Sequence, residues 1–368
     1  MAASTVQGIA VQPGVPHSAH HTSIALPSVA VGQARVRTLV GGICGTDREI
    51  IEAKFGAPPA GERALVIGHE VLGVVEEIGA QVVGLAVGDL VTATVRRPCP
   101  CPPCQAGQSD FCETLTYNER GILRLHGYWC EEWVEDVAYL VRVPRELGDL
   151  GVLLEPMTIA EKALRQAEAI QRRLPTWRVR TALVYGGGPI GVLAALVLRA
   201  RDIEVVVFDL KDGDAPNAQV VTAAGGRWVS LEGTTPQDAA RDLPPLDLVI
   251  ECTGRAEPVF ASMELLANNG VLAAISITGM GREATIPADR INLEFVLGNK
   301  VLVGCVNAHR DDFTAALADL QTIETRWPGL IGQVVTHRYD ALDPATLEHL
   351  THPAPGGIKG VLRFGALA

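Results

Sequence analysis

The sequence of 368 residues has no long hydrophobic run, no excess of positive charge and few cysteines. No window of about 18 uninterrupted apolar residues is present, so we expect no membrane-spanning helix. Lysine and arginine number 31 against 42 aspartates and glutamates, which gives a net charge of −11. A chain of this sign repels nucleic acid and anionic membranes, and we expect neither as a partner. Eight cysteines are too few for a disulfide scaffold in so long a chain.

Residues 1–14 also lack a basic segment followed by an apolar run. We therefore expect no secretory signal peptide and a cytoplasmic location. Internal repeats and low-complexity segments are missing as well. Hydrophobic residues make up 48% and charged residues 20% of the chain, which is typical of a globular protein. At roughly 100–200 residues per domain, the length predicts two domains.

Half of the cysteines are concentrated in fourteen residues, at Cys99, Cys101, Cys104 and Cys112, with the spacing C-x-C-x2-C-x7-C. Thiolates so close together in one loop are typical of tetrahedral Zn2+ with every position filled by protein. We predict a structural zinc site that holds the loop. The one-residue gap between Cys99 and Cys101 leaves open a loop that has lost its metal or uses three thiols. The proline-rich segment 98–112 is predicted to be irregular throughout.

The rest of the chain shows two different sequence patterns. Residues from about 5 to 155 are rich in valine, glycine and short alternating runs, which predicts a β-rich domain. Residues 158–174 then carry apolar positions at helical spacing, with Thr158 as the predicted N-cap. Strand-like runs alternate with helical stretches beyond this point, at 181–185, 204–208, 246–252, 270–277 and 301–305. That alternation predicts a parallel sheet with helices on both faces.

A glycine-rich turn connects the first of these strands to the following helix. Its first glycine allows a tight turn, its second lets a pyrophosphate approach the backbone, and its third lets helix and strand pack closely. The phosphates would lie at the helix N-terminus. The predicted cofactor-contacting residues of the turn are Gly186, Gly188, Pro189, Ile190 and Gly191.

An acidic residue, Asp209, follows 18 residues after Gly191, at the end of the next predicted strand. A carboxylate there can accept hydrogen bonds from ribose hydroxyls and would repel a 2′-phosphate, so NAD is favoured over NADP. The alternative is an ordinary glycine-rich turn with Asp209 as a loop residue.

Four further residues could bind a metal but are scattered along the sequence. Cys44 lies in a glycine-flanked turn after a predicted strand, His69 and Glu70 begin another strand, and Glu155 precedes the predicted domain boundary. Each has an ordinary structural explanation when taken alone. Spacing by itself cannot bring them together.

Over nearly its full length the chain resembles the zinc-dependent medium-chain dehydrogenases. The motifs that carry the resemblance are 42–47, 68–70, 87–89, the four-cysteine loop, 154–156 and 186–191. Within that superfamily it is most similar to the glucose 1-dehydrogenases. This second resemblance is carried by 44–50, 96–99, 118–122, 126–128 and 306–307.

The resemblance implies a catalytic zinc held by Cys44 and His69. Glu70 and Glu155 would either complete its ligand shell or hold the zinc-bound water. Zinc is not redox active, but as a Lewis acid it lowers the pKa of a substrate hydroxyl, and the hydride then passes to the nicotinamide.

The resemblance also implies roles for residues around the metal. Asp47 would orient His69 and fix its tautomer, and Thr46 would pass the alcohol proton towards solvent. Glu119 would hydrogen-bond sugar hydroxyls, and Asn307 would lie near the nicotinamide and the substrate. An exposed ion pair between Glu119 and Arg120 is the alternative for Glu119.

The implied α/β fold is a GroES-like β-rich catalytic domain at 1–156 and 309–368, with a Rossmann doubly wound parallel-sheet domain at 157–308. Members of the superfamily associate through the nucleotide-binding domain, so a homodimer or homotetramer is implied.

Two positions depart from the family pattern. The cysteine loop is one residue shorter than the usual x2-x2-x7 spacing. Val95 stands where the sugar enzymes often carry an asparagine that contacts the substrate, and a valine side chain cannot donate or accept a hydrogen bond.

We therefore expect a zinc-dependent, NAD-preferring dehydrogenase of an alcohol or polyol, with an aldose such as glucose as the leading substrate class. A non-sugar alcohol, aldehyde or ketone is the alternative that Val95 would favour. A non-catalytic NAD-binding or scaffolding protein is a further alternative. The residues that argue against it are the retained Cys44, Thr46, His69, Glu70 and Glu155.

Overall fold

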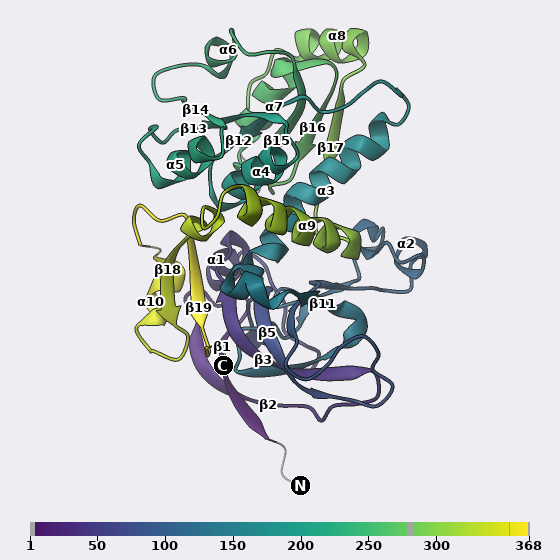
Figure 1. Cartoon of the computed structure of the whole chain (residues 1–368), viewed down its shortest axis with the longest axis vertical. Helices are drawn as coiled ribbons and strands as arrows, with labels where there is room; N and C mark the ends of the chain where they lie inside the picture. Colours follow the sequence, from purple (N-terminus) through teal and green to yellow (C-terminus); the bar gives the residue numbers. More distant parts are fainter. Residues whose placement is uncertain (1–3, 278–280, 282, 353, 367–368) are drawn as a thin grey trace. The chain divides into compact units, whose positions relative to one another are not determined.

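The computed structural model describes residues 4–277, 281, 283–352 and 354–366 (Figure 1). The chain divides into two compact units. The first comprises Met1–Glu155, Ala308–Thr314 and Val335–Ala368, and the second comprises Pro156–Asn307 and Ala315–Val334. Among the described residues, no helix is both long and apolar enough to cross a membrane.

The first unit is rich in strands, as the alternating sequence predicts. Its elements, with short 3-10 helices labelled η, are β1 (Thr5–Val11), β2 (His20–Ala25), β3 (Gln33–Gly42), α1 (Gly45–Ile51), β4 (Leu65–Val66), β5 (Glu70–Ile78), β6 (Leu90–Ala93), β7 (Arg96–Arg97), α2 (Pro102–Gln105), η1 (Ser109–Phe111), β8 (Asn118–Arg120), β9 (Arg124–Leu125), β10 (Glu132–Asp136), η2 (Val137–Tyr139), β11 (Leu140–Val143), η3 (Arg145–Leu153), β18 (Val335–Asp340), α10 (Thr346–Thr351) and β19 (Lys359–Arg363). The largest sheet has the order β11-β6-β5-β3-β19-β18, with β10 also paired to β3. Tyr128 and Trp129 are fully buried, each in a different hydrophobic cluster of this unit.

The second unit alternates strands with helices. Its elements are α3 (Leu154–Gln171), β12 (Thr181–Tyr185), α4 (Pro189–Ala200), β13 (Glu204–Asp209), α5 (Pro216–Ala223), β14 (Arg227–Ser230), α6 (Pro236–Ala239), β15 (Leu246–Glu251), α7 (Ala256–Leu265), β16 (Leu266–Ala274), α8 (Ala288–Gly298), β17 (Val301–Gly304) and η4 (Ile331–Val334), while α9 (Arg310–Arg326) begins in the first unit and continues in the second. The parallel sheet has the order β14-β13-β12-β15-β16-β17.

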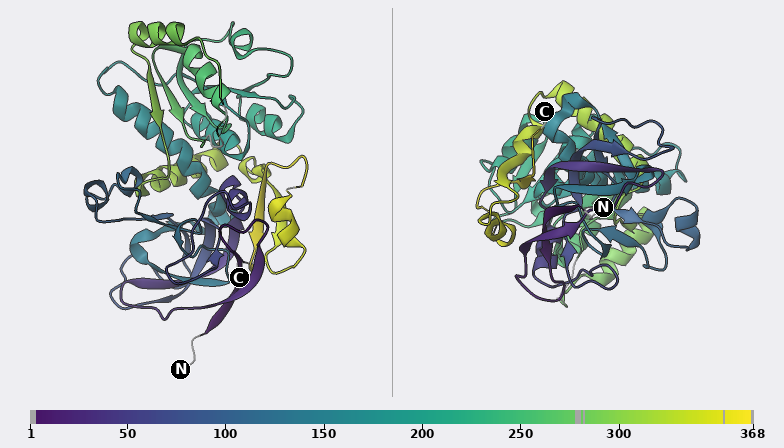
Figure 2. Two further views of the ribbon diagram at one scale, coloured as in Figure 1. Left: turned by 180° about the vertical axis from the view of Figure 1, so that it is seen from behind. Right: turned by 90° about the horizontal axis from the view of Figure 1, so that it is seen from below.

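This strand order is the 3-2-1-4-5-6 order of a doubly wound dinucleotide-binding sheet. The central strands β12 and β15 are buried along their whole length, as expected where helices cover both faces (Figures 1 and 2). The predicted fold class is confirmed. The direction of winding changes beside β12, so the glycine-rich turn that follows β12 lies where such sheets bind ligands.

Two local predictions are wrong. The helix predicted to start after Thr158 begins at Leu154, and Thr158 is fully buried inside it. Pro156 falls in the first turn of this helix, where its missing N–H has no partner to lose. Segment 98–112 is not irregular throughout, because Pro102 opens the short helix α2 and Ser109 opens η1.

Residues 315–334 differ from the predicted division, which grouped them with the catalytic domain. They belong to the second compact unit. Leu320 and Ile323 are fully buried there, and Asp319 accepts a hydrogen bond from Arg201 at 2.7 Å. Burial of this face of α9 is consistent with the place of the segment in the second unit.

Candidate active site and metal centres

Three of the scattered residues converge in the first unit. Cys44 lies at the N-terminus of α1, directly after β3, and His69 and Glu70 lie at the start of β5. The ends of β3 and β5 are adjacent because Gly42 pairs with Glu70 in the sheet. Potential ligand atoms of Cys44, His69 and Glu70 all lie within 4.8 Å of one another. The sheet register thus brings these three residues together, which their spacing in the sequence could not predict.

Asp47 fixes the orientation of two of these residues. The backbone N–H of Cys44 donates to Asp47 Oδ2 at 2.8 Å, and Asp47 Oδ1 lies 3.3 Å from His69 Nδ1. Burial would lower the pKa of His69, but the neighbouring carboxylate of Asp47 outweighs it and holds that pKa well above its ordinary value. With Nδ1 facing Asp47, Nε2 is the ring nitrogen left for a metal.

Lys359 is a fourth member of this centre that the sequence analysis missed. Its side chain is 2% exposed, its Nζ lies 2.5 Å from Glu70 Oε2, and it donates to the carbonyl of Ile43 at 3.2 Å. Burial would lower the pKa of Lys359, but the carboxylate of Glu70 raises it, with further help from Cys44 and Glu155. The lysine therefore stays charged and compensates a carboxylate that is itself fully buried.

Glu155 is buried at the start of α3 and belongs to the first unit. Burial raises its pKa to about 7, the charge of Glu70 adds to the rise, and His69 and Lys359 oppose it. Glu155 is not among the three residues whose ligand atoms converge within 4.8 Å. Both predicted roles, metal ligand or holder of a bound water, stay open.

The residues around Cys44 fit a catalytic zinc. A thiol, an imidazole and a carboxylate are the donor types that zinc prefers, and three protein ligands leave a position open for substrate. Glu70 Oε1 is buried and has no hydrogen-bond partner among the described residues, as a ligand atom facing an ion would.

The four-cysteine loop forms a second, separate cluster. Cys99 Sγ lies 3.4 Å from Cys112 Sγ and 3.7 Å from Cys104 Sγ, and Cys101 Sγ lies 3.7 Å from Cys112 Sγ. Zinc–sulfur bonds of about 2.3 Å at tetrahedral angles place the sulfurs about 3.8 Å apart. The four thiols therefore fit one zinc ion in spite of the shortened spacing.

The local backbone explains how the short spacing is accommodated. Cys101 is the N-cap of α2, and the prolines that follow it occupy the first positions of that helix. Hydrogen bonds from Thr114 and Thr116 lower the pKa of Cys99 to about 5, whereas burial raises the pKa of Cys104 to about 12. A bound metal would hold all four as thiolates.

The glycine-rich turn has the geometry that a dinucleotide needs. Gly186 has a φ of +103°, and a Cβ on Gly191 would lie 1.8 Å from the carbonyl oxygen of Gly186. A Cβ on Gly188 would meet no atom within 4 Å, which leaves open space beside the N-terminus of α4. Pro189 and Ile190 begin that helix. The turn fits a pyrophosphate.

Asp209 ends β13, next to this turn. Its Oδ2 accepts a hydrogen bond from the N–H of Gly187 at 2.6 Å, and its Oδ1 accepts one from the N–H of Lys211 at 2.9 Å. Asn217, which the sequence analysis did not identify, donates to the carbonyl of Gly187 at 2.7 Å and accepts from Lys211 Nζ at 3.1 Å. The carboxylate is therefore held at the edge of the predicted cofactor site.

Glu119 is buried on β8 and does not form the exposed pair with Arg120 that was the alternative. Its partner is Arg96, whose Nε donates to Oε1 at 2.9 Å, while Arg120 donates to Glu135. Val95 is 5% exposed.

Two predicted residues lie elsewhere. Thr46 is half-buried in α1, two residues after Cys44. Asn307 belongs to the second unit and has a φ of +60°, a left-handed conformation that asparagine tolerates.

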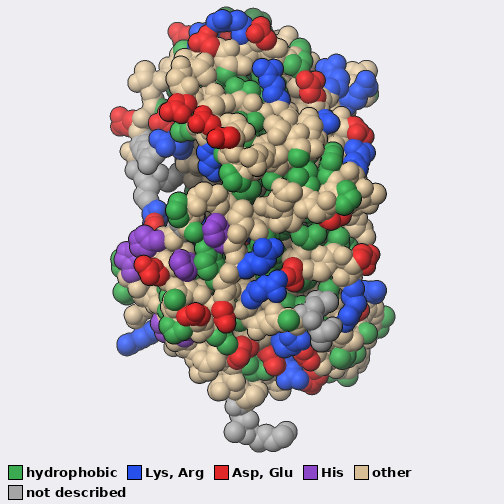
Figure 3. Space-filling model, turned by 60° about the vertical axis from the view of Figure 1, so that its left-hand side comes forward, with side chains coloured by type: hydrophobic (Ala, Val, Ile, Leu, Met, Phe, Trp, Pro, Cys, Tyr) green, Lys and Arg blue, Asp and Glu red, His purple; other side chains and the backbone are tan. Residues whose placement is uncertain are grey.

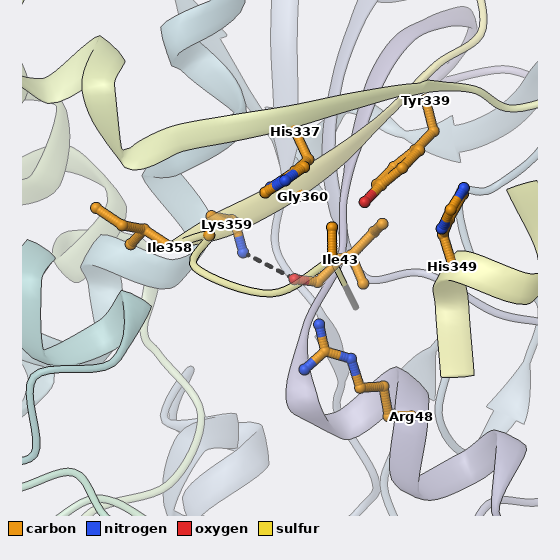
Figure 4. Close-up of a pocket in the computed structure, with 10 residues that line it drawn as sticks. Ile43, Arg48, His337, Tyr339, His349, Ile358, Lys359 and Gly360 are labelled. Carbon is orange, nitrogen blue, oxygen red and sulfur yellow. Dashed lines mark hydrogen bonds between the residues drawn. The ribbon is translucent and has the colours of Figure 1, made fainter. Parts of the chain in front are cut away.

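A pocket in the first unit lies beside the metal-binding group. Histidine side chains gather on one part of the face shown in Figure 3, and Tyr339 stacks between His337 and His349, with ring centroids 6.1 and 4.6 Å away (Figure 4). The lining residues are Ile43, Arg48, His337, Tyr339, His349, Ala354, Gly357, Ile358, Lys359 and Gly360. Ile43 and Lys359 connect this pocket to the centre, but Cys44, His69 and Glu70 do not line it.

Comparison with known proteins agrees with this architecture. Residues 30–145 match the model of the alcohol dehydrogenase GroES-like domain, and residues 148–363 match the model described as glucose dehydrogenase C-terminus. A glucose 1-dehydrogenase of Methanocella arvoryzae is 39% identical over 335 residues, which cover 90% of this chain and 93% of that protein. A glucose 1-dehydrogenase of Metallosphaera sedula is 36% identical over 344 residues, covering 91% and 92%.

A solved structure is similar over almost the entire chain. Haloferax mediterranei glucose dehydrogenase, in complex with NADP, Zn and gluconolactone, has a TM-score of 0.88 and 31% identity and covers 98% of this chain and 99% of its own.

A GroES-like unit joined to a doubly wound nucleotide-binding unit defines a medium-chain dehydrogenase. Within that class, the chain belongs to the glucose dehydrogenase family.

Proposed function

We propose that this protein is a zinc-dependent sugar dehydrogenase that transfers a hydride from a hydroxyl of an aldose to a nicotinamide cofactor. The observation that carries the proposal is the convergence of Cys44 with the buried residues His69 and Glu70 in a group with a zinc-type donor set. Support for the substrate class comes from the glucose 1-dehydrogenases that match 90% of the chain. The Haloferax structure holds gluconolactone, the kind of product that such an oxidation yields.

In this proposal Cys44, His69 and Glu70 hold the catalytic zinc. A zinc ion there would polarise the substrate hydroxyl and favour its ionised form. Asp47 keeps the ring of His69 in place, and Lys359 keeps the carboxylate of Glu70 in place.

Two residues are proposed to bind or transfer the proton that the substrate hydroxyl loses. Thr46, half-buried in α1, accepts this proton and passes it towards solvent. Glu155, whose pKa is raised to about 7 by burial, can hold a proton at neutral pH. In this proposal Glu155 either completes the metal shell or holds its water.

Glu119 and Asn307 are the proposed contacts for sugar hydroxyls and the nicotinamide. Glu119 supplies a buried carboxylate that Arg96 holds in place, and a carboxylate can accept hydrogen bonds from sugar hydroxyls. A structural zinc in the Cys99–Cys112 loop is part of the same proposal, and its four converging thiols support it.

We also propose that NAD is preferred over NADP. The carboxylate of Asp209 at the edge of the turn would accept hydrogen bonds from ribose hydroxyls and repel a 2′-phosphate. The Haloferax relative binds NADP, so the preference has to come from this chain's own residues around Asp209.

We further propose that two copies associate through the second unit. Strand β17 forms one edge of the sheet, and α8 exposes Leu293, Val296 and Leu297 to extents of 57, 67 and 72%. An edge strand that has no second neighbour among the described strands, preceded in the chain by a helix with exposed apolar side chains, is a surface that a second copy can cover.

The experiment that tests the function uses purified enzyme of measured metal content. Cofactor reduction is followed with aldoses, polyols and simple alcohols, for the parent and for Cys44→Ser. We expect preferential turnover of an aldose and its loss in Cys44→Ser, while Cys130→Ser, a buried thiol outside both clusters, keeps it. Full turnover in Cys44→Ser would refute the zinc assignment.

A second candidate substrate class is a non-sugar alcohol, and the buried apolar side chain of Val95 favours it. Turnover confined to simple apolar alcohols in the same assay would support this class and reject the sugar.

A further inference from the structure

The side chain of Arg96 contacts both Glu119 and the segment that carries the four cysteines. Arg96 stands directly opposite Glu119 in the β7–β8 pair, and its Nε and Nη2 each lie 2.9 Å from Glu119 Oε1. Its Nη1 donates to the carbonyl oxygen of Ser109 at 3.3 Å. Ser109 opens η1, which lies between Cys104 and Cys112.

A second contact connects the same guanidinium to the loop. Its central carbon lies 3.5 Å from the centroid of the Tyr117 ring, within the range of a cation–π interaction. Tyr117 in turn packs against the cluster of cysteine side chains. Arg96 therefore touches the loop both at its backbone and through an aromatic ring.

The guanidinium has no freedom to adjust to these partners one at a time. Arg96 is 4% exposed and Glu119 is 7% exposed. The group is planar and rigid, so a shift of the Ser109 carbonyl or of the Tyr117 ring turns the donors that face Glu119. A buried pair of this kind is sensitive to geometry because a displaced carboxylate stays out of water without its cation.

We propose that Arg96 couples the metal held by the cysteine loop to the position of Glu119, which makes Arg96 a positioning residue for sugar recognition. The role in sugar recognition rests on the proposed function, because it takes Glu119 to be a substrate contact. The coupling between the metal loop and Glu119 does not depend on the proposed function. Coupling between two sites is reciprocal, so a change at Glu119 must also change the affinity of the loop for its metal.

Arg97 provides a matched control on the same strand. It is 9% exposed and forms its own buried ion pair with Glu135, at 2.5 Å. Its other hydrogen bonds go to Thr94, Tyr128 and the carbonyl of Arg96 rather than to the cysteine loop. Replacing either arginine by lysine disturbs a buried pair, but only one of them lies between the loop and Glu119.

The first measurement is zinc affinity, determined by competition with a chromophoric chelator. It is made in a Cys44→Ser background, so that the cysteine loop is the one cluster with its full set of ligands. We expect the affinity to fall about tenfold in Arg96→Lys and in Glu119→Gln, and to stay within about twofold of the parent in Arg97→Lys. Unchanged affinity in both Arg96→Lys and Glu119→Gln would overturn the coupling, whatever the enzyme oxidises.

The second measurement is made with Cys44 intact. We expect Arg96→Lys to raise KM for the aldose about tenfold while kcat and the KM for NAD stay near those of the parent. Equal losses for aldose and NAD would indicate a general loosening and overturn the positioning role. Weakened zinc binding in a protein that oxidises no aldose would keep the coupling and reject the proposed function, together with the role of Arg96 in sugar recognition.

Discussion

Glycine at position 42 leaves the space in which the carboxylate of Glu70 lies. A Cβ added there would stand 1.8 Å from Glu70 Oε2 and 2.9 Å from its Cβ. The carboxylate, which is paired with Lys359 and belongs to the metal-binding group, would have to shift to make room. A glycine at residue 42 is therefore required for the carboxylate of Glu70 to take its place in the metal-binding group.

We expect Gly42→Ala to lower both catalytic zinc content and turnover, by about 10- to 100-fold, as is typical when a ligand loses its support. Gly45→Ala is the control, because a Cβ there would meet no atom within 4 Å. Metal analysis and initial rates on both variants test this. Parent-like zinc content in Gly42→Ala would show that Glu70 is not held for the metal.

Asp209 combines two roles that one substitution can separate. It accepts two backbone hydrogen bonds at the turn, and it carries the negative charge proposed to repel a 2′-phosphate. Asp209→Asn keeps an acceptor oxygen and removes the charge. We expect the ratio of kcat/KM for NADP to that for NAD to rise about tenfold in this variant. An unchanged ratio in both Asp209→Asn and Asp209→Ala would refute the cofactor role.

At the scale of the element, the cysteine loop is the segment that depends most on a metal. Its buried side chains are three of the thiols and Asp110, while Cys99 and Tyr117 are partly buried. Its regular structure amounts to two short turns, α2 and η1. A loop with so few apolar contacts gains its order from ligand bonds.

We expect Cys104→Ser to lose one zinc ion per chain and to lower the midpoint of thermal unfolding by several degrees. Cys130→Ser should keep its metal, since Cys130 is buried outside the cluster. Metal content and thermal denaturation of the two variants would be compared. Equal zinc content in both would contradict a metal site in the loop.

The elements also show how far the sequence could be interpreted. Strands β12 and β13 follow their predicted boundaries closely, and helix α4 follows the glycine-rich turn as predicted, because continuous apolar runs and the glycine turn are local signals. The start of α3 was misplaced because Pro156 resembles a boundary, although the first turn of a helix tolerates it.

Ion pairs between residues that are far apart in the sequence could not be predicted from it, for a physical reason. Lys359 and Glu70 are separated in sequence by most of the chain, including the whole of the second unit, and they meet because β19 and β5 both pair with β3. Nothing in a window around either residue encodes that register. Arg96 and Glu119 are likewise opposed only once β7 pairs with β8. The family motifs could indicate Cys44, His69 and Glu70, but not the buried cations that hold the acidic groups in place.

At the scale of the whole molecule, the edge of the nucleotide-binding sheet has to be covered or protected. Strand β17 has one neighbour, β16, and leaves its other side unpaired among the described strands. Leu302 on this strand is 43% exposed, and α8, the helix that precedes the strand in the chain, exposes Leu297 to 72%. Charged side chains usually protect such edges in a monomer, whereas apolar ones are usual where a second copy pairs.

We expect the parent to sediment as a dimer or a larger assembly, and Leu297→Glu to shift it towards the monomer, because a buried carboxylate without a partner strongly disfavours association. Val83→Glu, at a valine that is 88% exposed in the first unit, should leave the assembly unchanged. Sedimentation velocity over a range of concentrations makes the comparison. A parent that stays monomeric at the highest concentration would reject association through this face, and the exposed leucines of α8 would then need a different partner.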